Sequence, residues 1–337
     1  MALLGSPLRA DAGVHDGGVG ACNVCHTMHE GNPAESGSLL LASSPSDLCL
    51  NCHASEFGAV LGTDPLLPPP ERGPGNFVFL WSDNLNDGPN GATNPISGDG
   101  AGHNLNAPGH GLAPDGTRLH SPGGSYPAAS LQCTSCHDPH GNTNYRFLRG
   151  PQQDSSFMYP APTAVGLDVQ LGGVESNENH VAYRSGVDRW CGNCHGGYLL
   201  RHYRRDSSFG HQTDRPLSAV IQSRYDTYNG TADPIGGVAA TAYLAAVPFE
   251  DQDNYPARTS GPTTGSRLMC LSCHRAHASS APAAGRWDFK VARLGDDGVI
   301  SGSYPLPNPY LDANQESLCR KCHPSSGHIG DGIQPRW

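Results

Sequence analysis

The chain has 337 residues and a formal charge of −10, and hydrophobic residues make up only 36% of it. That apolar fraction, together with 43 glycines and 29 prolines, argues against an ordinary large hydrophobic core. No basic run occurs, which argues against nucleic acid as a partner, and no stretch approaches the roughly 20 apolar residues of a transmembrane helix.

A five-residue pattern, Cys-x-x-Cys-His, occurs six times and contains all 12 cysteines. Zinc ribbons and thioredoxin-like sites also use paired cysteines, but neither requires a histidine directly after the second one. C-x-x-C-H is the attachment site of c-type haem, where two thiols bond the porphyrin edge and the histidine ligates the iron. We therefore predict six covalently attached haem c groups, held by Cys22, Cys25 and His26; Cys49, Cys52 and His53; Cys133, Cys136 and His137; Cys191, Cys194 and His195; Cys270, Cys273 and His274; and Cys319, Cys322 and His323.

The fold that these motifs predict is a multihaem cytochrome c: mostly coil, with a few short α-helices and sparse β-structure, wrapped around a stacked haem chain. Residues 1–337 are expected to form a single unit, because turn residues fill the long segments between motifs. In chain order, the predicted helices are Ser46–Cys49, Pro216–Tyr228 capped by Asp214, Val238–Val247 ended by Pro248, and Gln315–Cys319.

The motifs alternate in kind. Motifs one, three and five continue to a second histidine three positions later, namely His29, His140 and His277, whereas the other three motifs do not. This alternation predicts three two-haem modules, at approximately 15–60, 126–200 and 265–328, joined by Gly/Pro-rich loops. Each added histidine lies one helical turn beyond its proximal ligand, on the same side of that haem, and cannot reach the far face of its own iron. We predict that each one ligates a different haem.

Eleven histidines remain after the proximal six, which exceeds the number needed for a second histidine at every iron, and four methionines are a poorer supply. The roles of His15, His103 and His211 stay open on spacing alone, because a histidine in a polar loop is usually solvated. We expect most of the five other histidines to be solvated or structural residues, and some of them to bond haem propionates. These five are His110, His120, His180, His202 and His328.

The sequence around the motifs carries a family resemblance. Its landmarks occur in order along the chain: His15-Asp-Gly-Gly-Val before Cys22, Cys-His-Thr-Met-His ending at His29, Gly102-His103-Asn104, Pro122-Gly-Gly-Ser-Tyr-Pro127, Cys-His-Asp-Pro-His-Gly141, Trp190-Cys191, Ala242-Tyr243-Leu244, Pro248-Phe249-Glu250 and Cys273-His274-Arg-Ala-His-Ala-Ser279. With these flanks the chain resembles the OmcS-type extracellular hexahaem cytochromes, which polymerise into conducting filaments.

The resemblance implies two histidines on every iron, with His15, His29, His103, His140, His211 and His277 as the distal set. It also implies that His29 ligates the haem of His274 in a neighbouring subunit, which would make the haem chain continuous through a homopolymer. Extracellular electron acceptors or other redox proteins would then be the remaining partners.

We consider three functions for a chain with these motifs. The leading hypothesis is long-range extracellular electron transfer through stacked bis-histidine haems in a head-to-tail filament, with no catalytic residue. The second is a monomeric periplasmic electron shuttle. The third, a multihaem reductase, needs an iron with an open position, whereas every motif here ends in histidine and histidines are in surplus. Haem attachment takes place outside the cytoplasm, so we expect an exported protein, although the start at Met1 is too short for a signal peptide.

Overall fold

The computed structural model describes residues 15, 22–27, 39–54, 60–62, 73–81, 84–85, 94–95, 98–168, 170, 175–203, 211, 213, 215–230, 235–252, 257–289, 292–294, 309–310, 312 and 314–323. Most of these residues lie in irregular structure, as predicted. The α-helices are α1 (Cys22–Cys25), α2 (Pro45–His53), α3 (Gly98–Ala101), α4 (Cys133–Cys136), α5 (Val187–Tyr203) and α6 (Ala219–Thr227).

Short 3₁₀ turns and two small sheets complete the described elements. The 3₁₀ turns are η1 (Phe77–Leu80), η2 (Pro108–His110), η3 (Ala128–Ser130), η4 (Tyr145–Phe147), η6 (Ala239–Thr241), η7 (Cys270–Ser272), η8 (Pro282–Ala284) and η10 (Leu318–Lys321). Antiparallel strands form two pairs: β1 (Asn84–Leu85) with β2 (Asn94–Pro95), and β3 (Thr163–Val165) with β4 (Ala182–Ser185).

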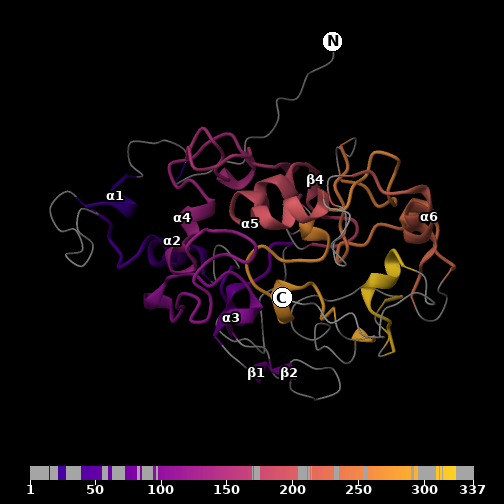
Figure 1. Ribbon diagram of the computed structural model, residues 1–337, viewed down its shortest axis with the longest axis horizontal. Coiled ribbons are helices and arrows are strands. Elements are labelled where there is room, and N and C mark those ends of the chain that lie inside the picture. The colour runs from indigo at the N-terminus through magenta and orange to yellow at the C-terminus, as the bar shows by residue number, and fades with distance from the viewer. Residues whose placement is uncertain are drawn as a thin grey trace, which may run out of the picture.

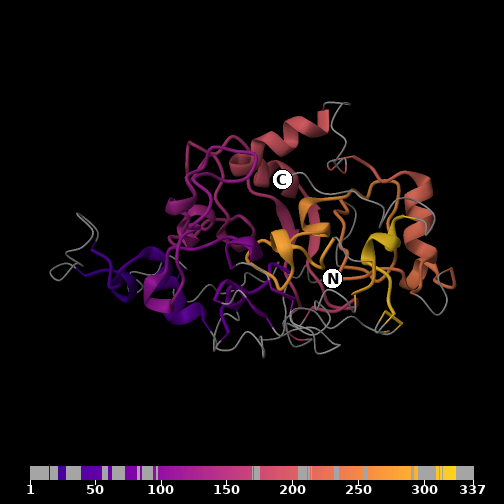
Figure 2. The same ribbon diagram turned by 60° about the horizontal axis from the view of Figure 1, so that its bottom comes forward.

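The helices from α1 to α6 spread along the long axis of the molecule (Figure 1), and the segment around Ala278 then returns to pair with Gly102. In both views α1 lies at one end and α6 at the other, with α2 and α4 next to α1 and α5 between the two ends (Figures 1 and 2). The apolar core is divided into three clusters, and each cluster packs against motif cysteines: one against Cys133, one against Cys191, and one against Cys273, Cys319 and Cys322. The small cores therefore follow the row of motifs.

The helix predictions had mixed outcomes. The helix predicted from Pro216 is confirmed as α6, but it begins at Ala219, and Ser218 caps it by accepting a hydrogen bond from the Ile221 N–H at 3.3 Å. Asp214, the predicted cap, lies outside the described residues. The short helix at the second motif is confirmed as part of α2, with Ser44 as its N-cap. At the sixth motif the structure has only the 3₁₀ turn η10, which begins at Leu318.

The helix predicted over Val238–Val247 is wrong: only η6 forms there, and residues 242–249 are buried in turns. The backbone amides in this segment find partners outside it. The Tyr243 N–H donates to the Thr259 carbonyl at 2.8 Å, and the Ala245 N–H donates to the Asn177 side chain at 2.9 Å. Tertiary hydrogen bonds replace the helical ones, so local propensity does not decide the conformation.

The longest helix, α5, was not predicted. It carries the fourth motif and holds His195 at a break in helical geometry, with φ −114° and ψ 36°. No helix among the described residues is long and apolar enough to span a membrane.

Candidate haem-binding sites

The motif cysteines follow one another through the molecule in chain order. The thiols of Cys49 and Cys133 are hydrogen-bonded, as are those of Cys191 and Cys270, which joins motif two to three and motif four to five. Electrostatic coupling joins the remaining neighbours, through Cys25 with Cys52, Cys136 with Cys194, and Cys273 with Cys319 and Cys322. None of the 12 cysteines forms a disulfide. Six adjacent attachment sites therefore form one row.

Four proximal histidines each face a second histidine from a distant part of the chain. The ring centroids are 6.1 Å apart for His15 and His53, 6.3 Å for His26 and His140, 5.9 Å for His103 and His195, and 5.7 Å for His211 and His323. The planes of the first two pairs are nearly parallel, at 15° and 13°, and those of the other two are tilted by 46° and 53°.

These separations match the space that a metal ion needs between two imidazoles. Parallel rings in van der Waals contact lie about 3.5–4 Å apart, as His180 and Tyr243 do at 3.6 Å. A metal held by two imidazoles needs two bonds of about 2 Å each and two ring radii of about 1.1 Å each, or about 6 Å in all. Each of the four histidine pairs therefore has room for one iron, and the paired thiols would supply the covalent links for a haem c.

Hydrogen bonds at Nδ1 fix the orientation of several of these rings. His137, His195 and His274 each donate from Nδ1 to a backbone carbonyl, on Arg146 at 2.8 Å, Pro122 at 2.7 Å and Ala283 at 3.0 Å. His15 and His103 do the same, with Pro139 at 3.1 Å and Ala276 at 2.6 Å. Since a carbonyl only accepts, Nδ1 carries the proton and Nε2 keeps the lone pair that a metal binds.

Two of these carbonyls belong to residues with unusual backbone conformations. Arg146 and Phe147 have φ of 49° and 54°, and Ala283 and Ala284 have φ of 58° and 52°. The left-handed region costs a non-glycine residue roughly 1–2 kcal/mol. In both places the strained turn presents a carbonyl to the Nδ1 of the proximal histidine nine positions earlier. Strain that recurs beside two equivalent ligands points to a functional constraint.

Burial favours the neutral, metal-binding form in several of these imidazoles. Desolvation lowers the pKa of His195 to about 4, helped by the nearby His103. Desolvation is also the main cause that lowers the pKa of His277 to about 3, and the charge of His137 is the next cause. The ring of His277 stacks on Phe77 at 4.5 Å. The pKa values of His53, His274 and His323 are lowered mainly by desolvation as well.

Two proximal histidines, His137 and His274, have no ring contact with another imidazole among the described residues. The ring of His274 packs edge-on against Phe289 at 5.4 Å. The histidine closest to it electrostatically is His103, which faces His195. His29, the ligand predicted for His274, lies outside the described residues.

The surplus histidines have other surroundings. His180 is buried, and its Nδ1 and Nε2 face the carbonyls of Val181 at 3.1 Å and Arg258 at 3.0 Å, which leaves neither nitrogen open to a metal. His120 is exposed and faces no second imidazole among the described residues. His328 and the side chain of His202 lie outside the described residues.

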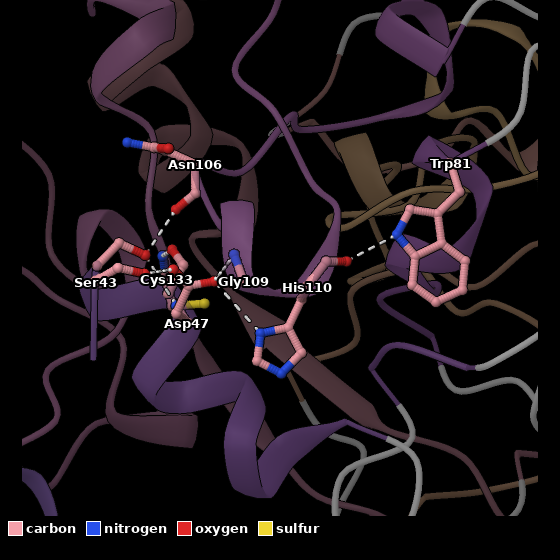
Figure 3. Close-up of polar contacts among 9 residues, drawn as sticks. Ser43, Asp47, Trp81, Asn106, Gly109, His110 and Cys133 are labelled. Atoms are coloured by element: carbon pink, nitrogen blue, oxygen red, sulfur yellow. Dashed lines mark hydrogen bonds and ion pairs between the residues drawn. The ribbon is translucent and has the colours of Figure 1, made fainter. Parts of the chain in front are cut away.

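His110 belongs to a hydrogen-bond network that fixes the second motif (Figure 3). Asp47 of α2 accepts from Ser43 Oγ at 2.5 Å, from the Gly109 N–H at 2.9 Å and from His110 Nδ1 at 3.4 Å. Burial alone would raise the pKa of Asp47, but its hydrogen bonds outweigh burial and lower it. The indole of Trp81 donates to the His110 carbonyl at 3.1 Å, which ties a further segment to the same network.

The motifs and the coil-rich fold are those of multihaem c-type cytochromes, a class of electron-transport proteins. The model of the doubled CXXCH motif matches residues 15–58 and 126–155. Along the sequence, the chain is 29% identical to C-type cytochrome OmcS of Geobacter sulfurreducens, over 92% of this chain and 93% of that protein.

Two solved structures have the same fold. One is the Outer Membrane Cytochrome S filament from Geobacter sulfurreducens, with a TM-score of 0.67 and 24% identity. The other is a cryo-EM structure of the OmcS nanowires of the same organism, with a TM-score of 0.69 and 25% identity. Each alignment covers 92% of this chain and 99% of the other. The resemblance to OmcS-type cytochromes and the predicted fold class are confirmed.

Proposed function

We propose that this chain conducts electrons over long distances, outside the cell, along six haem c groups that are each ligated by two histidines. The observation that carries the proposal is the set of four histidine pairs with ring centroids 5.7–6.3 Å apart. When bound, the haems supply irons that exchange one electron at a time; the chain holds them close together, fixes their ligands and shields them from water. No side chain is assigned a catalytic role.

The ligand assignment extends these pairs. His53, His26, His195 and His323 are the proximal ligands opposite His15, His140, His103 and His211, in that order. The electrostatic coupling of His137 with His277 supports a fifth pair. The cysteine pairs that precede the six proximal histidines attach the porphyrins. Three two-haem modules, at approximately 15–60, 126–200 and 265–328, make up one haem-wrapped unit.

The sixth distal ligand is His29 of a neighbouring subunit, which binds the iron of His274 and makes the filament continuous. In support, the described residues provide no imidazole facing His274. The same holds for His137, but His277 is assigned to that site, which leaves His274 without a ligand among the described residues of its own chain. The two ends of the long axis also expose apolar side chains: Val24, Leu39 and Leu41 near α1 are 46–52% exposed, and Val220, Ile235 and Val238 near α6 are 59–77% exposed. Contact between unlike ends generates an open helical fibre when its rotation does not close.

Electron microscopy of the protein as secreted, without refolding, tests the assembly. Regular haem-containing filaments are expected, and His29→Ala is expected to yield separate subunits that each have one five-coordinate iron. Discrete particles of one subunit in the unmodified protein would refute the filament. Six haems per chain are expected from the intact mass, and a lower count would refute the ligand assignment.

A further inference from the structure

The third and fifth motifs are two copies of one structural unit. In each, a serine inside the motif accepts a hydrogen bond from the backbone N–H of the residue that directly precedes the motif. Ser135 accepts from Gln132 at 3.0 Å, and Ser272 accepts from Met269 at 3.2 Å. In each, the proximal histidine pairs through a β-bridge with the residue eleven positions later, Leu148 or Gly285. The strained turns described above occupy the same place in both copies.

An arginine ends both copies and lies against the motif. The Nε of Arg149 donates to the Thr134 carbonyl at 2.7 Å, and the Nε of Arg286 donates to the Leu271 carbonyl at 2.6 Å. Thr134 and Leu271 both follow the first cysteine of their motif. The backbone N–H of each arginine also donates to the carbonyl of the second motif cysteine, at 2.9 Å and 2.7 Å. These bonds hold a guanidinium, which stays positive at every accessible pH, beside the attachment site.

The first motif has the same backbone arrangement with a different side chain. The N–H of Leu41 donates to the Cys25 carbonyl at 3.0 Å, in the position that Arg149 occupies at the third motif. Leu41 is uncharged and 52% exposed, whereas Arg286 is 1% exposed. The backbone pairing therefore does not require an arginine, and the charge is a separate feature of the third and fifth motifs.

The contacts with the Thr134 and Leu271 carbonyls hold each guanidinium next to a residue that lies between the two motif cysteines. The electric field of each arginine would therefore act on a porphyrin bonded to those cysteines. Arg286 is buried, so screening of its charge by water is weak.

We propose that Arg149 and Arg286 raise the reduction potentials of the haems at the third and fifth motifs. Reduction of an iron from the ferric to the ferrous state adds one electron, taken from a neighbouring haem, and the site loses one unit of positive charge. A fixed guanidinium stabilises the reduced state relative to the oxidised one. The proposal rests on haem attachment at these motifs, and the two arginines act through charge, without touching the iron.

A second pair of equivalent residues distinguishes the two sites. The Cys133 N–H donates to Ser46 Oγ at 3.0 Å, whereas the Cys270 N–H donates to Asp188 Oδ1 at 2.6 Å. Ser46 and Asp188 each lie three positions before the first cysteine of the preceding motif. The fifth site thus has a buried carboxylate in the position where the third site has a hydroxyl, although the carboxylate of Asp47 also acts on Cys133 at the third site. The carboxylate of Asp188 offsets part of the effect of Arg286.

Redox titration of the intact, haem-loaded protein, followed by its absorbance, tests this proposal. Arg149→Gln keeps a donor for the Thr134 carbonyl but removes the charge. One of the six haem components is expected to become harder to reduce by about tenfold in its equilibrium constant, which is about 59 mV for one electron. Arg149→Lys, which keeps the charge, is expected to restore most of the shift. Arg286→Gln should lower the reduction potential of one haem component. Asp188→Ser, which introduces a serine as at position 46, should raise the reduction potential of one component.

Three results would overturn the proposal: unchanged titration in Arg149→Gln and Arg286→Gln, equal shifts in the lysine and glutamine variants, or glutamine variants that load fewer than six haems. The last result would assign the arginines to haem attachment instead. Haem content and low-spin spectra of the unmodified protein are measured first. Fewer than six haems in the unmodified protein would count against the proposed six-haem function. Six haems together with unchanged reduction potentials in the variants would count only against the proposed role of the arginines.

Discussion

Replacement of His103 by alanine is the sharpest test of the ligand assignment. The ring of His103 lies 5.9 Å from that of His195, at the spacing of two imidazoles on one iron. Its removal leaves one of the six predicted irons with an open position, so one haem in six is expected to become high-spin while five stay low-spin. Electron paramagnetic resonance of the oxidised protein measures this proportion directly.

The backbone at His103 explains why the variant should still fold. The His103 N–H donates to the His277 carbonyl at 2.8 Å, and this bond does not depend on the side chain. His180→Ala is the matched control, because His180 is also buried but has a backbone carbonyl at each ring nitrogen. All six haems should stay low-spin in that control. A fully low-spin His103→Ala protein, or a high-spin signal in His180→Ala, would refute the reasoning.

Two further substitutions test how the chain holds the motifs. Asp47→Asn should lower the free energy of unfolding by about 1–3 kcal/mol near neutral pH, because Asp47 accepts from Ser43, Gly109 and His110. The pKa of Asp47 is lowered in the folded protein. Its contribution to the free energy of unfolding is therefore complete above the ordinary pKa of 3.8 and is lost as the pH falls through the folded pKa. The free energies of unfolding of the two proteins, measured by denaturant titration, should therefore converge in acid. A constant difference at all pH values would contradict this linkage. Leu244→Ala, at a fully buried position, should cost about 2–5 kcal/mol in the same assay, and a loss below about 1 kcal/mol would contradict the packing.

The predicted attachment sites depend least on the fold, because that chemistry is local. Two thiols and a histidine in five residues must form one site, whatever the rest of the chain does. The extra histidines at His140 and His277 were also informative, because a ligand one helical turn from its own proximal histidine can only serve another iron. By contrast, the pairing of His15 with His53 and of His211 with His323 depends on how long loops return, which no local pattern encodes.

Local propensity was a weaker guide to the secondary structure. It located α6, which has its own N-cap, but it wrongly predicted a helix over Val238–Val247, where the amides bond to Thr259 and Asn177 instead. The strained turns at Arg146 and Ala283 could have been suspected only from the shared spacing of nine residues after His137 and His274. Spacing shows that two segments are alike, but not that their backbone is left-handed.

The paired histidines also explain how a chain with few apolar residues can hold a single structure. His140 follows the third motif but faces His26 of the first, and His103 precedes the third motif but faces His195 of the fourth. Each such pair closes a loop that spans at least one other motif, so an iron held between the two rings would restrict the chain on both sides of it. Ligation would then contribute to the stability of the fold, as it does in small metal-dependent domains. Because the closed loops overlap, an iron at one site would also favour the native arrangement at the neighbouring sites.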